Sequence, residues 1–154
     1  MTLAEEFRQM CQTYFPRWHA ATAWCLEERP CASWIETHGQ GQVTPARSFC
    51  DPTTRRITID VSRENVLQRQ ATMMHAICHA ITTVGHGARF RAQMDRAATR
   101  AQALGATALA EALHRQVQAY RSFGRLQACE AHTSARPLAP HAQLTDQRRL
   151  LTTS

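Results

Sequence analysis

The stretch Ala71–Phe90, ATMMHAICHAITTVGHGARF, contains three of the eight histidines of the chain and decides how the rest is interpreted. His75 and His79 are four residues apart in an apolar run, so on a helix they project from one face, one turn apart. Two imidazoles at this spacing can hold a zinc ion through ring nitrogens at roughly 2.0–2.1 Å. Glycines flank His86 on both sides, and we expect their backbone freedom to turn this third histidine back toward the same ion. The stretch predicts one zinc ion with three protein ligands and a fourth position open to water, as in catalytic zinc sites.

The residue after the first histidine does not fit this chemistry. Zinc peptidases with the HExxH signature place there a Glu that takes the proton from the zinc-bound water. In this chain the position is occupied by Ala76, and a methyl group cannot act as a general base. The sequence thus predicts a complete metal site without its catalytic carboxylate.

Two segments together resemble the SprT-like (Spartan-type) family of zinc metalloproteases. Members carry HExxH on a helix, followed by a GHGxxF segment that supplies the third histidine, and residues 85–90 read GHGARF. Residues 49–59, FCDPTTRRITI, are similar to the strand–turn–strand that precedes the metal helix in the family. The resemblance covers roughly residues 30–120. The chain departs from the family at Ala76, in the short interval between the second and third histidines, and in having no zinc ribbon after the domain.

The resemblance implies a zinc-dependent peptidase whose substrates are proteins, including proteins associated with DNA. In such an enzyme a carboxylate at position 76 would be the general base, so the chain as written is expected to be inactive. We interpret Ala76 as an engineered substitution that disables a protease and keeps its metal. The alternative is a natural pseudoenzyme that acts as a zinc-stabilised DNA- or protein-binding module. In a third interpretation, the histidines belong to a helical core and hold no metal.

The elements around this stretch predict an α+β domain, with a small antiparallel sheet packed beside a helical core that carries the HxxxH metal helix (zincin-like). At 154 residues the chain is long enough for one domain with a real core. The pattern fades after residue 123, so we expect a domain at 1–123 and a flexible tail at 124–154. The expected helices are residues 2–15, from Ser62 as N-cap to about Val84, 88–104 and from Thr107; the expected strands are 33–37, 46–50 and 56–61.

The strand at 56–61 carries a functional expectation. Ile57, Ile59 and Val61 alternate with polar residues, so they are expected to face one side of the sheet. By analogy with zinc peptidases, we expect this strand to lie at the sheet edge near the metal helix. An edge strand there can hold an extended substrate by strand addition.

The charge pattern bears on partners. The net charge is +6, and every basic residue is an arginine, the side chain that best suits phosphate and carboxylate groups. Arg89, Arg91, Arg96 and Arg100 lie off the apolar stripe of their helix. They are the predicted nucleic-acid contacts, in competition with the simpler interpretation of a solvated helix face.

Cysteine usage and hydropathy bear on location. The six cysteines contain no C-x-x-C pair, which indicates free, buried thiols in a reducing cytoplasm rather than a disulfide framework. No apolar run approaches the roughly 20 residues of a membrane span. The first residues are acidic where a secretory signal would be basic, so a cytoplasmic protein without a membrane partner is expected.

Overall fold

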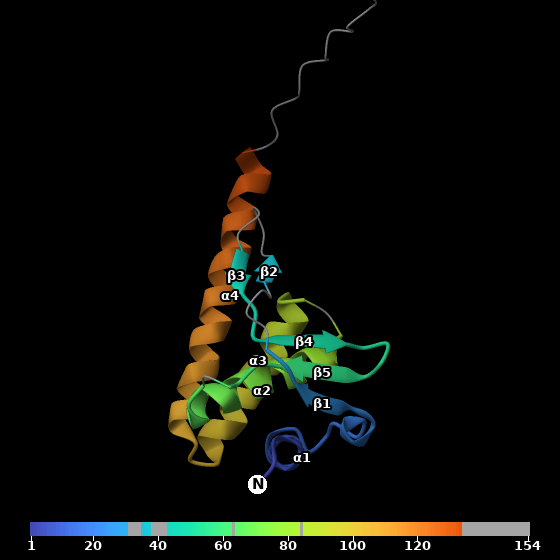
Figure 1. Ribbon diagram of the computed structural model, residues 1–154. Coiled ribbons are helices and arrows are strands. Elements are labelled where there is room, and N and C mark those ends of the chain that lie inside the picture. Colours follow the sequence, from blue (N-terminus) through green and yellow to red (C-terminus); the bar gives the residue numbers. More distant parts are fainter. Residues whose placement is uncertain (31–34, 38–42, 63, 84, 134–154) are drawn as a thin grey trace, which may run out of the picture.

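The computed structural model describes residues 1–30, 35–37, 43–62, 64–83 and 85–133, and for 35–37, 43–45 and 123–133 it describes the backbone alone (Figure 1). The described elements are α1 (Leu3–Tyr14), the 3-10 helix η1 (Ala21–Ala23), β1 (Cys25–Glu28), β2 (Ile35–Thr37), β3 (Val43–Pro45), β4 (Ser48–Asp51), β5 (Arg56–Ile59), α2 (Val66–Thr82), α3 (Ala88–Ala103) and α4 (Thr107–Thr133). The chain is therefore an α+β protein, as the sequence predicts.

The helix α2 is the centre of the structure. It packs against α1, α3, α4 and the strands β4 and β5. In Figure 1 it lies between the sheet on one side and the long helix α4 on the other. Met73, Met74, Ile77 and Cys78 on α2 are completely buried, because the helix has neighbours on most of its sides. The stretch that carries the histidines thus lies in the middle of the domain.

The sheet differs from the expected one. Its strand order is β1-β5-β4, with β4 antiparallel and β1 parallel to β5, so the sheet is mixed rather than antiparallel. The predicted edge strand, β5, is the middle strand, and β4 lies at an edge of the described sheet. No strand was predicted at β1. Its parallel pairing with β5 covers the side of β5 that was expected to be open. The strand predicted at 33–37 includes β2, which pairs with β3 in a separate antiparallel sheet, while residues 33 and 34 lie outside the described residues.

Local sequence rules account for the first helix and for the hairpin. Thr2 and Glu5 form the predicted capping box at the start of α1, in which the Glu5 N–H donates to Thr2 Oγ1 at 3.2 Å. In the turn between β4 and β5, Asp51 Oδ1 accepts from the Thr53 N–H at 2.9 Å. Burial of the alternating side chains of the return strand is confirmed, since Ile57 and Ile59 have an exposed fraction of 0%.

The start of α2 was predicted wrongly. The N-cap is Asn65, which forms a capping box with Gln68, and not Ser62. The Ser62 hydroxyl donates instead to Asp60 Oδ1 at 2.7 Å, so it is occupied before the helix begins. Glu64, expected in the first helical turn, precedes the helix and accepts a hydrogen bond from Thr72 Oγ1.

The last two helices begin where the sequence places them. Gly105, with a φ of +79°, separates α3 from α4 in the left-handed conformation that favours glycine. Helix α4 continues to Thr133, so the predicted domain end at residue 123 lies inside a helix, and residues 134–154 lie outside the described part. None of the described helices is both long and apolar enough to cross a membrane.

The cysteines follow the expectation in part. Cys11, Cys25, Cys50 and Cys78 are free thiols. Cys11 and Cys78 are buried, and burial raises the pKa of Cys11 to about 12, which keeps that thiol protonated at neutral pH. Cys25 is exposed, so the prediction of burial is wrong for this residue.

Candidate metal centre

Three histidines meet between the end of α2 and the start of α3. His75 and His79 project from one face of α2, and His86 reaches them from the segment that joins α2 to α3. His75 is buried, with 7% of its surface exposed, while His79 and His86 are half-buried. The structure therefore brings together the three predicted ligands in one cluster that is open on one side.

The three Nε2 atoms point at one another. The distances are 3.1 Å between His75 and His79, 3.0 Å between His79 and His86, and 3.2 Å between His75 and His86. Hydrogen bonds alone cannot account for all three of these contacts. A neutral imidazole carries one N–H, which points along its own ring plane toward a single acceptor. One cation in front of the triangle would instead accept a lone pair from every nitrogen.

The size of the triangle fits a zinc ion. Three nitrogens at about 2.0–2.1 Å from a tetrahedral ion lie about 3.3–3.4 Å apart, so the observed spacing requires an expansion of only a few tenths of an ångström. Neutral imidazole nitrogen is a preferred zinc ligand, and the described residues of the cluster include no fourth His, Cys, Asp or Glu. The donor set thus suits an ion that keeps one position for water or substrate.

Gln116 on α4 orients the first ligand. Its Oε1 lies 3.1 Å from His75 Nδ1, and an amide oxygen can only accept, so Nδ1 carries the proton and Nε2 presents its lone pair to the cluster. Burial lowers the pKa of His75 well below its ordinary value, with the neighbouring His79 and His86 as further causes. His75 is therefore neutral at neutral pH, the state that a metal ligand needs. The sequence analysis missed Gln116, because no local pattern marks it.

Two aromatic rings support the cluster. Phe90, the last residue of the GHGxxF segment, is completely buried and stacks on His79 with ring centroids 4.2 Å apart. Tyr120 on α4 stacks on His86 with ring centroids 4.0 Å apart and an interplanar angle of 5°. Each ring restricts the orientation of one imidazole, which lowers the entropy lost when a metal binds. Tyr120, like Gln116, was not found from the sequence.

The turn that returns His86 does not use its glycines as expected. Only Gly105 among the described glycines has a positive φ, so neither Gly85 nor Gly87 needs the freedom of glycine. The left-handed residue is Thr83, with a φ of 54°, which caps the end of α2. Arg91 then holds the segment in place, since its Nη1 donates to the His86 carbonyl oxygen at 3.0 Å.

Position 76 lies beside the cluster inside the core. Ala76 follows His75 on α2 and has 1% of its surface exposed, within the same apolar cluster as Met73 and Ile77. Its methyl group offers no proton acceptor, so the three-histidine cluster has no general base at this position.

The four predicted nucleic-acid contacts all lie on α3 and differ in burial and in their contacts. Arg91 is half-buried and bonded to the histidine segment, and Arg89 is exposed at the start of α3. Arg96 and Arg100 are exposed farther along α3, where Arg100 Nε donates to the Thr13 carbonyl oxygen of α1 at 2.6 Å. The structure thus places Arg91 at the metal centre and the last two arginines at the junction of α1 and α3.

Comparisons of this chain with protein-family models, with curated proteins and with solved structures found no match.

Proposed function

We propose that this chain holds one zinc ion at His75, His79 and His86 and is a peptidase scaffold of the SprT-like, zincin type that is inactive as written. The observation that carries the proposal is the convergence of the three Nε2 atoms at 3.0–3.2 Å from one another. The resemblance of the GHGARF segment and of the upstream hairpin to the family supports it, as does the α+β architecture around α2.

A zinc ion bound here would lower the pKa of a coordinated water to about 7 and polarise a peptide carbonyl. The residues of the chain then have separate tasks. Gln116 keeps His75 in the tautomer that presents Nε2, and the ring of Tyr120 holds the plane of His86. Proton transfer from water to the leaving amine requires a carboxylate next to His75, and Ala76 cannot supply it.

The edge strand β4 is the element that would hold a peptide substrate. It packs against α2, and its other side is an edge of the described sheet. An extended peptide can pair with such an edge through backbone hydrogen bonds, which select for an unfolded segment rather than for a particular sequence. Phe49 on β4 has an exposed fraction of 62%, so it offers apolar surface to a peptide at this edge. The partners implied are proteins of the cytoplasm, including proteins bound to DNA.

Ala76 has two explanations within this proposal. An engineered Glu-to-Ala substitution would remove the general base and leave the metal ligands in place. The second candidate is a natural pseudoenzyme that binds DNA or protein through a zinc-stabilised fold, and the burial of Ala76 favours it: with 1% of its surface exposed, the alanine already packs in the core without any charge to stabilise.

Restoring the carboxylate separates these two functions. We expect Ala76→Glu to cleave an unfolded or DNA-bound protein, because position 76 directly follows His75 on α2, about 100° around the helix, as the glutamate of the HExxH signature does. The matched control is Ala76→Gln, which has nearly the same size and no base. The measurements are zinc content by elemental analysis, melting temperature and cleavage of a panel of protein substrates.

The peptidase proposal requires that Ala76→Glu cleaves about 10²–10⁴ times faster than Ala76→Gln, while the two variants hold equal zinc. Equal zinc and no cleavage by either folded variant would reject the peptidase and leave the zinc-stabilised binding module. Absence of zinc from the unchanged chain would reject both.

A further inference from the structure

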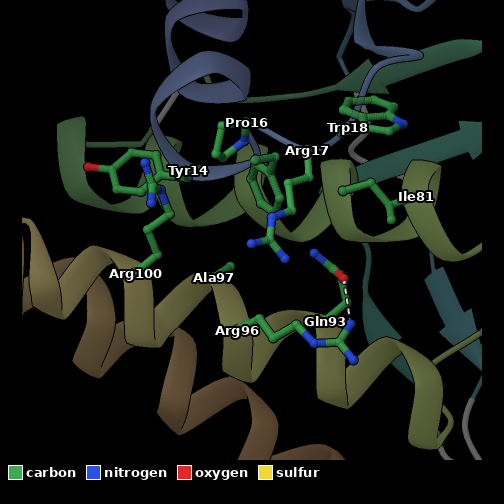
Figure 2. A pocket seen from close by; sticks show the side chains of 10 residues that line it. Tyr14, Pro16, Arg17, Trp18, Ile81, Gln93, Arg96, Ala97 and Arg100 are labelled. Carbon is green, nitrogen blue, oxygen red and sulfur yellow. Dashed lines mark hydrogen bonds between the residues drawn. The ribbon is translucent and has the colours of Figure 1, made fainter.

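A groove with a volume of about 500 Å³ lies where the end of α1 meets α2 and α3 (Figure 2). Tyr14, Arg17 and Trp18 contribute to it from the end of α1 and the segment that follows, and Arg96 and Arg100 contribute from α3. No acidic side chain is among its lining residues. The volume lies within the range of pockets that bind small molecules, so the groove can take a ligand and not only solvent.

The three arginines of the groove have no acidic partner among the described residues. Arg100 donates to a backbone carbonyl oxygen and Arg96 Nη1 donates to Gln93 Oε1 at 3.1 Å, while no carboxylate pairs with Arg17. Other arginines of the chain do pair with acidic side chains, namely Arg29, Arg56, Arg69, Arg115 and Arg121. Three like charges around one groove repel one another, and an anion between them would remove that repulsion.

The groove also offers rings and a neutral donor. Tyr14 and Trp18 are half-buried and line opposite ends of the groove (Figure 2). Figure 2 shows the Arg17 side chain reaching down from the α1 side toward Gln93 and Arg96 on α3. The Gln93 oxygen is occupied by Arg96, which leaves its NH₂ group to donate to a ligand. Guanidinium groups beside aromatic rings suit a ligand that has both negative charge and a flat ring.

We propose that this groove binds a nucleotide unit, with the phosphate between Arg17 and Arg96 and the base against the ring of Trp18. Arginine binds phosphate oxygens through two parallel hydrogen bonds. Any of the four bases can stack on an aromatic side chain, because each base has a flat aromatic face. The unit can come from a free nucleotide or from a single strand of nucleic acid, and the experiment distinguishes the two sources. Of the four arginines selected from the sequence, Arg96 and Arg100 belong to this site, and Arg17 joins them from a distant part of the chain.

The groove is separate from the metal centre. Its α2 residue is Ile81, two positions after His79 and so about 200° around the helix, on the side that faces away from the ligand. The inference therefore stands without the proposed peptidase function. Zinc can bind with the groove empty, and the groove can bind its ligand without zinc.

The test measures binding by the full chain at low salt to three probes: a labelled eight-nucleotide single-stranded DNA, adenosine monophosphate and inorganic phosphate. The variant is Arg17→Gln with Arg96→Gln, since both side chains are exposed and their loss leaves the core intact. The control is Arg115→Gln, which removes an exposed arginine of α4 outside the groove. Melting temperature and zinc content of each variant establish that the fold is kept.

We expect the double variant to bind the DNA about tenfold or more weakly, while Arg115→Gln changes the affinity less than about twofold. In the double variant, the slope of the logarithm of the binding constant against the logarithm of the salt concentration should be smaller by about 1 to 1.5. Adenosine monophosphate should quench tryptophan fluorescence and inorganic phosphate should not, because only the nucleotide brings a ring to Trp18. Displacement of the DNA by the mononucleotide indicates a free-nucleotide site, and binding of the DNA alone indicates a single-strand site. The proposal would be overturned if neither the DNA nor adenosine monophosphate bound. Equal losses of affinity in the double variant and in Arg115→Gln would also overturn it.

Discussion

His75 Nδ1 on α2 lies 3.1 Å from Gln116 Oε1 on α4, which ties a proposed metal ligand to a residue 41 positions away in the chain. This contact fixes the tautomer of His75 and the direction of its lone pair. It also explains why α4 matters to a site whose three histidines come from α2 and from the segment that joins α2 to α3.

The first prediction concerns Gln116. We expect Gln116→Ala to lower zinc affinity about 10–100-fold, because the imidazole of His75 loses the acceptor that orients it. Gln116→Glu keeps an acceptor at this position and should retain most of the affinity. The control, Gln118→Ala, changes an exposed residue of the same helix. Competition with a zinc chelator measures the affinity, and equal affinity for Gln116→Ala and Gln118→Ala would contradict an orienting role.

The second prediction concerns the ligands themselves. Replacement of His75, His79 or His86 by Ala should reduce bound zinc below one equivalent and remove the rise in melting temperature that zinc produces. Metal bound only by the folded state stabilises it, by about 2.7 kcal/mol at a free zinc concentration 100 times the dissociation constant. His19→Ala, at an exposed position outside the cluster, serves as the control. A melting temperature of the unchanged chain that does not respond to zinc or to chelator would reject the metal site.

The third prediction concerns pH and Glu64. Burial raises the pKa of Glu64 above its ordinary value of 4.5, and neighbouring Asp60 acts in the same direction, while Thr72, Arg47 and Arg69 oppose it. One carboxylate oxygen, Oε2, is buried without a hydrogen bond among the described residues. The folded state therefore holds the proton of the Glu64 carboxyl group more tightly than the unfolded state does. The stability that Glu64 contributes is present below pH 4.5 and is lost as the pH rises through the pKa of the folded state.

We thus expect Glu64→Gln to raise the melting temperature at pH 7, with a smaller gain near pH 4. The comparison is Glu5→Gln, which should act with the opposite sign. The backbone N–H and hydroxyl of Thr2 lower the pKa of Glu5, so its charge is favoured in the fold and the variant should lower the melting temperature at pH 7. Thermal unfolding of zinc-free protein across this pH range checks both. A lower melting temperature for Glu64→Gln at pH 7 would show that its charge stabilises the fold.

The fourth prediction contrasts two glycines. A methyl group added at Gly85 meets no atom within 4 Å, and its φ lies outside the left-handed region, so Gly85→Ala should leave both stability and zinc affinity nearly unchanged. Gly105→Ala should lower the free energy of unfolding by about 1–2 kcal/mol, because φ at this position is +79°. Denaturant unfolding and zinc titration of both variants check this. A loss of zinc affinity in Gly85→Ala alone would restore the interpretation that the turn to His86 needs glycine.

The local directions of side chains could be predicted from short stretches of sequence. The spacing of His75 and His79 places both rings on one face of a helix, since this follows from the helical period alone. Alternation put Ile57 and Ile59 on the buried face of a strand, and the pair Thr2 and Glu5 marked the start of a helix. Each of these results depends on residues that are a few positions apart. Over that distance, the geometry of a helix or a strand fixes the relative directions of the side chains.

The residues that lie opposite those faces depend on the packing of elements that are distant in the chain. Gln116 and Tyr120 meet the histidines because α4 packs along α2 and α3, and Arg17 meets Arg96 because the end of α1 lies over α3. The parallel pairing of β1 likewise turned the expected edge strand into the middle one. The period of an element states which side chains share a face but carries no information about the partner of that face. The partner is set by burial summed over the whole core, a property of the complete chain and not of any short segment.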